Sequence, residues 1–188
     1  MKKILFIGGV LLTVFVIYLC NMDKKVYYVV LGEDVDRYSS FVKNYLKDRD
    51  VLERYLDDFS SSSVRISDII NDINDNKKLD DGTTFKNALI KADLVTLSIN
   101  VDDVYSREDD VYDYIDELAL CLDDLLKLMR EYCKEDIVFV GYSGDKAINY
   151  LNKKFKEVCL NYGVSYVDGT KMIGNKVVQK VSDKLFND

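Results

Sequence analysis

The chain has 188 residues, of which 48% are hydrophobic, and it contains neither histidine nor proline. A chain of this length can bury a core of its own, while the lack of histidine excludes mechanisms that need a Ser-His pair, a Cys-His pair or a histidine metal ligand. The net charge is −7; residues 1–25 contribute +3, which leaves −10 for residues 26–188 and argues against nucleic-acid binding.

A long apolar segment lies at the amino terminus. Residues 4–20 are 17 uncharged and mostly apolar residues, and a helix of that length extends about 26 Å, close to a bilayer core of about 30 Å. A cleavable signal is the alternative, but the residues near the end of the segment are too large for a signal-peptidase site. We therefore predict a membrane anchor at residues 1–25 and one domain at residues 26–188.

The charges beside this segment predict its orientation. Lysines lie on both sides of it, and the α-amino group adds a slight excess of positive charge before it. This bias favours a cytoplasmic amino end. We expect a single-pass protein of the cell membrane whose domain is extracellular.

The rest of the chain alternates strand-like and helix-like segments. Apolar and β-branched runs predict strands at 26–31, 92–99, 137–142 and 164–168. Helical spacing of apolar residues predicts helices at 36–47, 50–57, 66–73, 109–132, 145–161 and 174–186. Because such alternation builds βαβ units, we predict an α/β domain with a flavodoxin-like, three-layer, doubly wound parallel sheet.

In a sheet of this kind the pocket lies beyond the carboxyl ends of the strands. Polar residues follow three of the predicted strands there. They are Gly32-Glu33-Asp34, Asn100-Val101-Asp102-Asp103 and Asp168-Gly169-Thr170-Lys171.

The sequence around these segments resembles the blocks of the SGNH/GDSL hydrolase family. VYYVVLGEDVD looks like the first block, FSSSSVRISDII the second, and ADLVTLSINVDD the third. DIVFVGY and LNKKFKEVCLNYGVSYVD resemble the later strand-helix-strand, so the similarity covers about residues 26–186. The resemblance implies a serine nucleophile in the first block, a glycine amide in the second and an asparagine in the third. It also implies a late Asp-x-x-His that supplies the base.

This chain departs from the family at the catalytic positions. The matching residues are Asp34, Ser63, Asn100, Asp102, Asp168 and Lys171, with Gly169 as the alternative to the last. An aspartate replaces the nucleophile, a serine the glycine, and a second aspartate the asparagine. Asp168 matches the late aspartate, but no imidazole follows it. Carboxylates would face a developing oxyanion with negative charge, so the resemblance predicts a fold without the activity.

We therefore predict a catalytically inactive binding or structural module of the cell envelope. It would need no cofactor, would contact the membrane through residues 4–20, and could bind a cell-envelope glycan or an acyl ligand. Two alternatives stay open. Glu33, Asp34, Asp102 and Asp103, together with Asp36, form an all-oxygen cluster that could hold Ca²⁺ or Mg²⁺. A residual esterase could instead use Asp34 as nucleophile, with only Lys171 to assist it.

The four cysteines predict no metal site, because no CxxC pair occurs. Cys121 stands among leucines and is predicted to be a small buried hydrophobe. Cys133 and Cys159 could form a disulfide in an exported domain, although the sequence does not place them within bonding distance.

Overall fold

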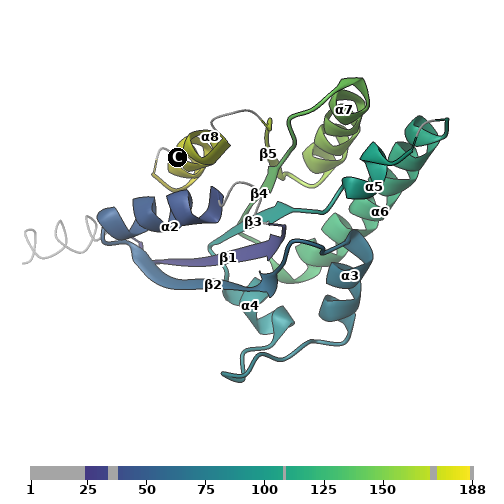
Figure 1. Ribbon diagram of the computed structural model, residues 1–188. Helices are drawn as coiled ribbons and strands as arrows, with labels where there is room; N and C mark the ends of the chain where they lie inside the picture. The colour runs from purple at the N-terminus through teal and green to yellow at the C-terminus, as the bar shows by residue number, and fades with distance from the viewer. Residues whose placement is uncertain (1–23, 34–37, 108, 170–172, 187–188) are drawn as a thin grey trace, which may run out of the picture.

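The computed structural model describes residues 24–33, 38–107, 109–169 and 173–186 (Figure 1). In chain order its elements are β1 (Val26–Gly32), α2 (Tyr38–Asp48), β2 (Leu52–Ser60), α3 (Ile66–Asn74), α4 (Phe85–Lys91), β3 (Leu94–Ser98), α5 (Asp102–Tyr105), α6 (Val111–Tyr132), β4 (Asp136–Val140), α7 (Lys146–Asn161), β5 (Ser165–Val167) and α8 (Ile173–Phe186).

The five strands form one parallel sheet in the order β2-β1-β3-β4-β5. This order is that of flavodoxin-like folds, in which the chain winds first to one side of β1 and then to the other. The predicted α/β class and parallel sheet are confirmed. The central strands β1 and β3 are buried along their whole length, as expected for a sheet covered on both faces.

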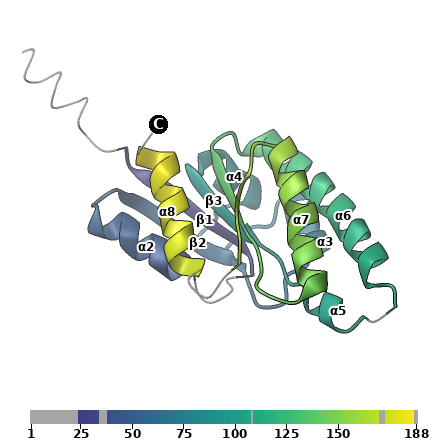
Figure 2. The same cartoon turned by 90° about the horizontal axis from the view of Figure 1, so that it is seen from above.

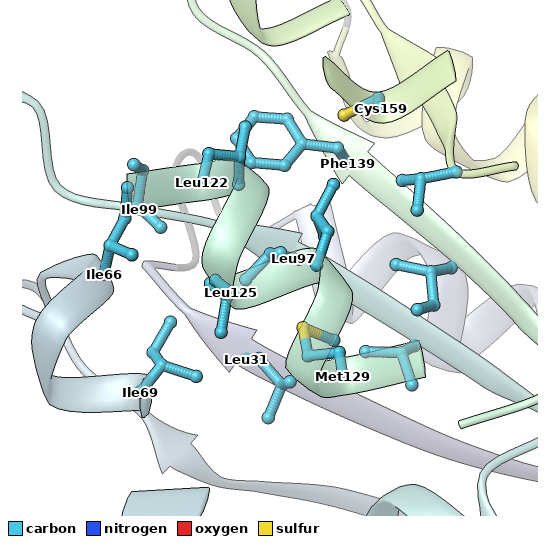
Figure 3. Packing of buried hydrophobic residues seen from close by; sticks show 14 of the residues in the cluster. Leu31, Ile66, Ile69, Leu97, Ile99, Leu122, Leu125, Met129, Phe139 and Cys159 are labelled. Carbon is cyan, nitrogen blue, oxygen red and sulfur yellow. The ribbon is translucent and has the colours of Figure 1, made fainter. Parts of the chain in front are cut away.

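Helices cover both faces of the sheet, so that the domain has three layers (Figures 1 and 2). Helices α2 and α8 lie side by side on one face, where alternate residues of β1 such as Tyr28 and Val30 join them in a small core. Helices α3, α4, α6 and α7 cover the other face and form the larger core. In Figure 3, α6 and the sheet meet through the side chains of Leu122, Leu125, Met129, Leu31, Leu97 and Phe139.

The segment predicted as a helix at 50–57 is the edge strand β2, and that prediction is wrong. Leu52, Tyr55, Leu56 and Phe59 follow the i, i+3, i+4, i+7 spacing of an amphipathic helix. In the structure, the pairing of β2 with β1 shifts register twice, and at each shift β2 contains one residue more than β1. Because each extra residue reverses the alternation of side chains, Leu56 and Phe59 point to the larger core while Leu52 and Tyr55 point to the smaller one.

The cysteines differ partly from the sequence-based expectation. Cys121 is exposed on α6, so its predicted burial is wrong. It lies one residue before the buried Leu122, which places it about 100° around the helix and outside the buried stripe. Cys133 and Cys159 are buried in the larger core as free thiols.

Among the residues that the structure describes, no helix is both long enough and apolar enough to cross a bilayer. The anchor predicted at residues 4–20 lies outside these residues.

Candidate functional site

The carboxyl end of β1 fits tightly against the end of β3. Gly32 has a φ of +78°, and a Cβ atom at this position would lie 1.8 Å from the carbonyl oxygen of Ser98. The next residue, Glu33, donates its backbone N–H to the same oxygen at 2.9 Å. Only glycine combines this left-handed conformation with so close a backbone approach. The backbone of Glu33 is thereby fixed at the carboxyl ends of the strands, where the predicted site lies.

Asn100 joins the loop after β3 to the loop after β2. Its backbone N–H donates to the carbonyl oxygen of Val64 at 3.0 Å. Its side-chain Nδ2 donates to the carbonyl oxygen of Ser62 at 3.2 Å and to Oδ2 of Asp102 at 3.0 Å. The backbone N–H of Asp102 donates in return to Oδ1 of Asn100 at 3.2 Å. Both amide hydrogens of Asn100 are thus engaged within the protein. Ser63 is exposed in the same loop, beside this network.

The carboxylates at this edge make the site acidic. Glu33 is half-buried, and its pKa is raised first by burial and then by the negative charge of Asp102. Asp103 forms an ion pair with Arg65 at 3.1 Å. Across the described part of the chain, no group of three or more cysteine or carboxylate side chains is arranged to hold a metal ion. Of the proposed cation ligands, Asp34 and Asp36 lie outside that part.

Tyr142 fills the floor of the site, between the ends of β3 and β4. Its hydroxyl group donates to the carbonyl oxygen of Ile99 at 2.7 Å and accepts the backbone N–H of Ile99 at 3.0 Å. The hydroxyl of Ser98 lies 3.4 Å from the same phenol oxygen. Burial raises the pKa of Tyr142 far above its ordinary value. This phenol therefore stays neutral and satisfies both backbone groups of Ile99 where the sheet ladder ends.

A hollow of about 480 Å³ opens beyond β4 and β5. Its wall is the chain around Tyr142, which Asn152 of α7 holds by two hydrogen bonds. The backbone N–H of Tyr142 donates to Oδ1 of Asn152 at 3.0 Å, and Nδ2 of Asn152 donates to the carbonyl oxygen of Tyr142 at 2.7 Å. Tyr166 donates its hydroxyl to the same Oδ1 at 2.7 Å. Gly169 lies so close that a Cβ there would be 2.1 Å from the carbonyl carbon of Tyr142.

The structure divides the predicted site residues between two places. The positions that it brings together at the ends of β1, β2 and β3 are Glu33, Ser63, Asn100, Asp102 and Asp103. Asp168 instead lines the hollow beyond β4 and β5. Asp34 and Lys171 lie outside the described residues.

Tyr142 and Asn152 are central to this geometry and were not predicted. Tyr142 is the last residue of a strand-like apolar run. Its hydroxyl group, at the end of that run, is the only sequence feature that could have indicated a role. Asn152 is one polar residue on an amphipathic helix, which is too common a pattern to single out.

No protein-family model matches the sequence, and no curated protein matches it significantly. Among solved structures, the fold is similar to that of a family two carbohydrate esterase from Cellvibrio japonicus, with a TM-score of 0.51 and 14% sequence identity. The match covers 86% of this chain and 61% of the esterase chain. The likeness is one of fold. It shows that this chain shares an α/β fold with that esterase and, at this identity, says nothing of activity.

Proposed function

We propose that this chain is an SGNH-like domain that binds a carbohydrate or acyl ligand of the cell envelope without hydrolysing it. The fold likeness to a carbohydrate esterase supports the hydrolase-type scaffold. The chemistry at the strand ends supports the loss of hydrolysis. The proposal includes a membrane tether at residues 4–20 and a domain outside the cell.

The state of Asn100 carries the proposal. Acyl transfer requires hydrogen-bond donors aimed at the oxygen that becomes negative, and losing one such donor slows the reaction about 10²- to 10³-fold. Here the amide hydrogens of Asn100 already bind Ser62 and Asp102. A carboxylate stands beside them, and Glu33 adds another whose pKa is raised partly by that neighbour. An oxyanion would meet negative charge instead of free donors.

The serine hydroxyls near the strand ends also argue against a nucleophile. Ser98 is buried, and its hydroxyl lies 3.4 Å from the Tyr142 phenol oxygen. The hydroxyl of Ser60 donates to the carbonyl oxygen of Asp57 at 2.6 Å. Within the described ranges, no serine at these strand ends donates to a carboxylate, and the chain contains no histidine to act as base. A serine without a base within hydrogen-bond reach is a weak nucleophile.

Turnover measurements test the absence of hydrolysis. Purified full-length chain is incubated with p-nitrophenyl acetate and with acetylated xylo-oligosaccharides, beside an active carbohydrate esterase as positive control. We expect rates equal to the buffer blank. Turnover above the blank that disappears in Asp34→Ala would show that the chain is an enzyme with an aspartate nucleophile, and the proposal would be wrong.

The tether is tested separately. Strand β1 begins at Val26. A membrane segment at residues 4–20 would therefore join the domain at the amino-terminal edge of the sheet, whereas the candidate site lies at the carboxyl ends of the strands. A strand of seven residues spans about 23 Å, which would hold the site away from the bilayer. We expect the chain in the membrane fraction after carbonate extraction, and its domain digested by protease added outside whole cells. A shortened chain released into the medium would indicate a cleaved signal.

A further inference from the structure

The hollow beyond β4 and β5 continues over helix α7 into a second one. The second hollow has a volume of about 460 Å³ and lies where the first turns of α6 and α7 meet. It is lined by Tyr112, Lys146, Asn149, Tyr150 and Lys153. Asn149 and Lys153 line the first hollow as well. The two hollows therefore adjoin along the amino-terminal half of α7, which lies beside α6 in Figure 2, and together they are called the trough. Each part falls within the range of about 300–1,000 Å³ typical of ligand sites.

The second part of the trough presents an aromatic surface. Tyr112 is 41% exposed. Its ring meets that of Tyr150 edge to face, with centroids 5.1 Å apart. The hydroxyl of Tyr150 donates to Asp116 at 3.1 Å, and Asp116 also binds Lys154 at 2.9 Å. These contacts anchor Tyr150, and the Tyr112 ring packs against it. A solvent-exposed aromatic ring offers a flat apolar face to the C–H groups of a sugar.

The trough also carries positive charge that no carboxylate of the described residues pairs with. Lys146, Lys153 and Lys156 line it, and none of them makes an ion pair with any residue that the structure describes. This contrasts with Lys154, one residue away, whose ammonium group binds Asp116. The three lysines stand on a domain whose net charge is −10 over residues 26–188. Such a local excess of positive charge attracts an anion.

The first part of the trough supplies polar groups for hydroxyls. Asn149 exposes its amide there, and Asp168 its carboxylate. The main chain behind them is held rigid by Asn152 through its two bonds to Tyr142. Rigid polar groups bind a ligand at a lower entropy cost than mobile ones.

We propose that this trough binds an anionic oligosaccharide, with one sugar ring stacked on Tyr112 and ligand carboxylates at the lysines. The inference rests on the proposed binding function and names its site and ligand class. A nucleic acid also combines flat rings with negative charge. It is disfavoured because residues 26–188 carry a net charge of −10, which repels the closely spaced phosphates of a nucleic acid.

Binding of tetragalacturonate to the full-length chain, measured by calorimetry, tests the proposal. We expect binding that weakens as salt is added, and no comparable binding of the fully methyl-esterified tetrasaccharide, which lacks the charges. Tyr112→Ala should weaken binding about three- to tenfold and Tyr112→Phe should retain it, because the ring face provides the contact. Lys153→Gln combined with Lys156→Gln should weaken binding about tenfold.

Lys176→Gln on α8 is the matched control, since Lys176 is exposed on the opposite face of the sheet. This variant should bind as the unaltered chain does. Three results would overturn the proposal: no binding of tetragalacturonate, binding that is unaffected by the tyrosine and lysine changes, or tighter binding of a tetranucleotide. These outcomes are independent of ester turnover, so a failure here is distinguishable from a failure of the non-hydrolytic function.

Discussion

Replacing Tyr142 by phenylalanine is the most informative single change in this domain. The substitution removes one oxygen atom and preserves the ring, so that packing is nearly unchanged. That oxygen is fully buried and is bonded to both the N–H and the C=O of Ile99, at 3.0 and 2.7 Å. The hydroxyl of Ser98 also approaches it at 3.4 Å.

The expected cost follows from these partners. A buried backbone group that loses its hydrogen-bond partner costs about 1–3 kcal/mol. Tyr142→Phe leaves two such groups of Ile99 without this partner. We therefore expect the free energy of unfolding to fall by about 2–4 kcal/mol. For a chain of 188 residues, this corresponds to a melting temperature lower by about 5–12 °C.

Urea unfolding monitored by circular dichroism and by tyrosine fluorescence measures this difference, and agreement of the two signals establishes a two-state transition. Tyr45→Phe is the matched control. Its hydroxyl bonds Ser182 and Arg49 near the surface, where water can replace it, so we expect a loss below about 1 kcal/mol. Equal losses in the two variants would refute the assigned role of the Tyr142 hydroxyl.

Three further outcomes are expected. Burial and a neighbouring carboxylate raise the pKa of Glu33, so the ionised side chain destabilises the folded state. The stability that the protonated form contributes is fully present below the unfolded pKa. It is lost as pH rises through the folded pKa. Glu33→Gln should thus raise the melting temperature at pH 7 and make the melting temperature depend less on pH between 7 and 5. Glu53→Gln, at an exposed position of β2, should do neither. Iodoacetamide should label the exposed Cys121 of the folded chain but not the buried Cys133 or Cys159. Burial also raises the pKa of the Cys159 thiol to about 12. Peptide mass spectrometry measures the labelling, and labelling of all three cysteines would contradict the buried positions. Millimolar calcium or magnesium should leave the melting temperature unchanged, and a rise would restore the cation site.

Long, regular segments could be predicted from the sequence. The strands at β1, β3 and β4 are continuous apolar runs, and the stripe of α6 repeats at helical spacing over 22 residues. Such patterns survive folding because both faces of a buried strand and one face of a helix must be apolar wherever they pack. Short elements carry too few residues for a pattern, and α4 and α5 were therefore not predicted.

The edge strand shows where a local pattern misleads. Leu52, Tyr55, Leu56 and Phe59 satisfy helical spacing in the sequence, yet they lie in β2. The register shifts that redistribute these residues between two cores exist only against β1. The sequence of this segment by itself does not show that it pairs with β1.

The candidate site divides in the same way. Residues directly after a strand could be placed at the mouth in advance, because parallel strands end at one edge of the sheet. Glu33, Asn100 and Asp102 do lie together there. The sequence could not show that the Asn100 amide is already engaged, nor that Asp168 belongs to another hollow, because both depend on how loops from distant segments meet.

Composition and periodicity by themselves determined the chemistry that is absent and the class of the fold. A chain without histidine has no imidazole base wherever its residues lie, and alternating strands and helices close into a parallel sheet. Tertiary structure alone decided which polar groups remain free to bind. Asn100 and Asn152 are both asparagines on the surface of the same domain, and both are engaged by backbone groups more than nine residues away in the chain. Hydrogen bonds between distant segments form only after the sheet has assembled, and no local pattern encodes them.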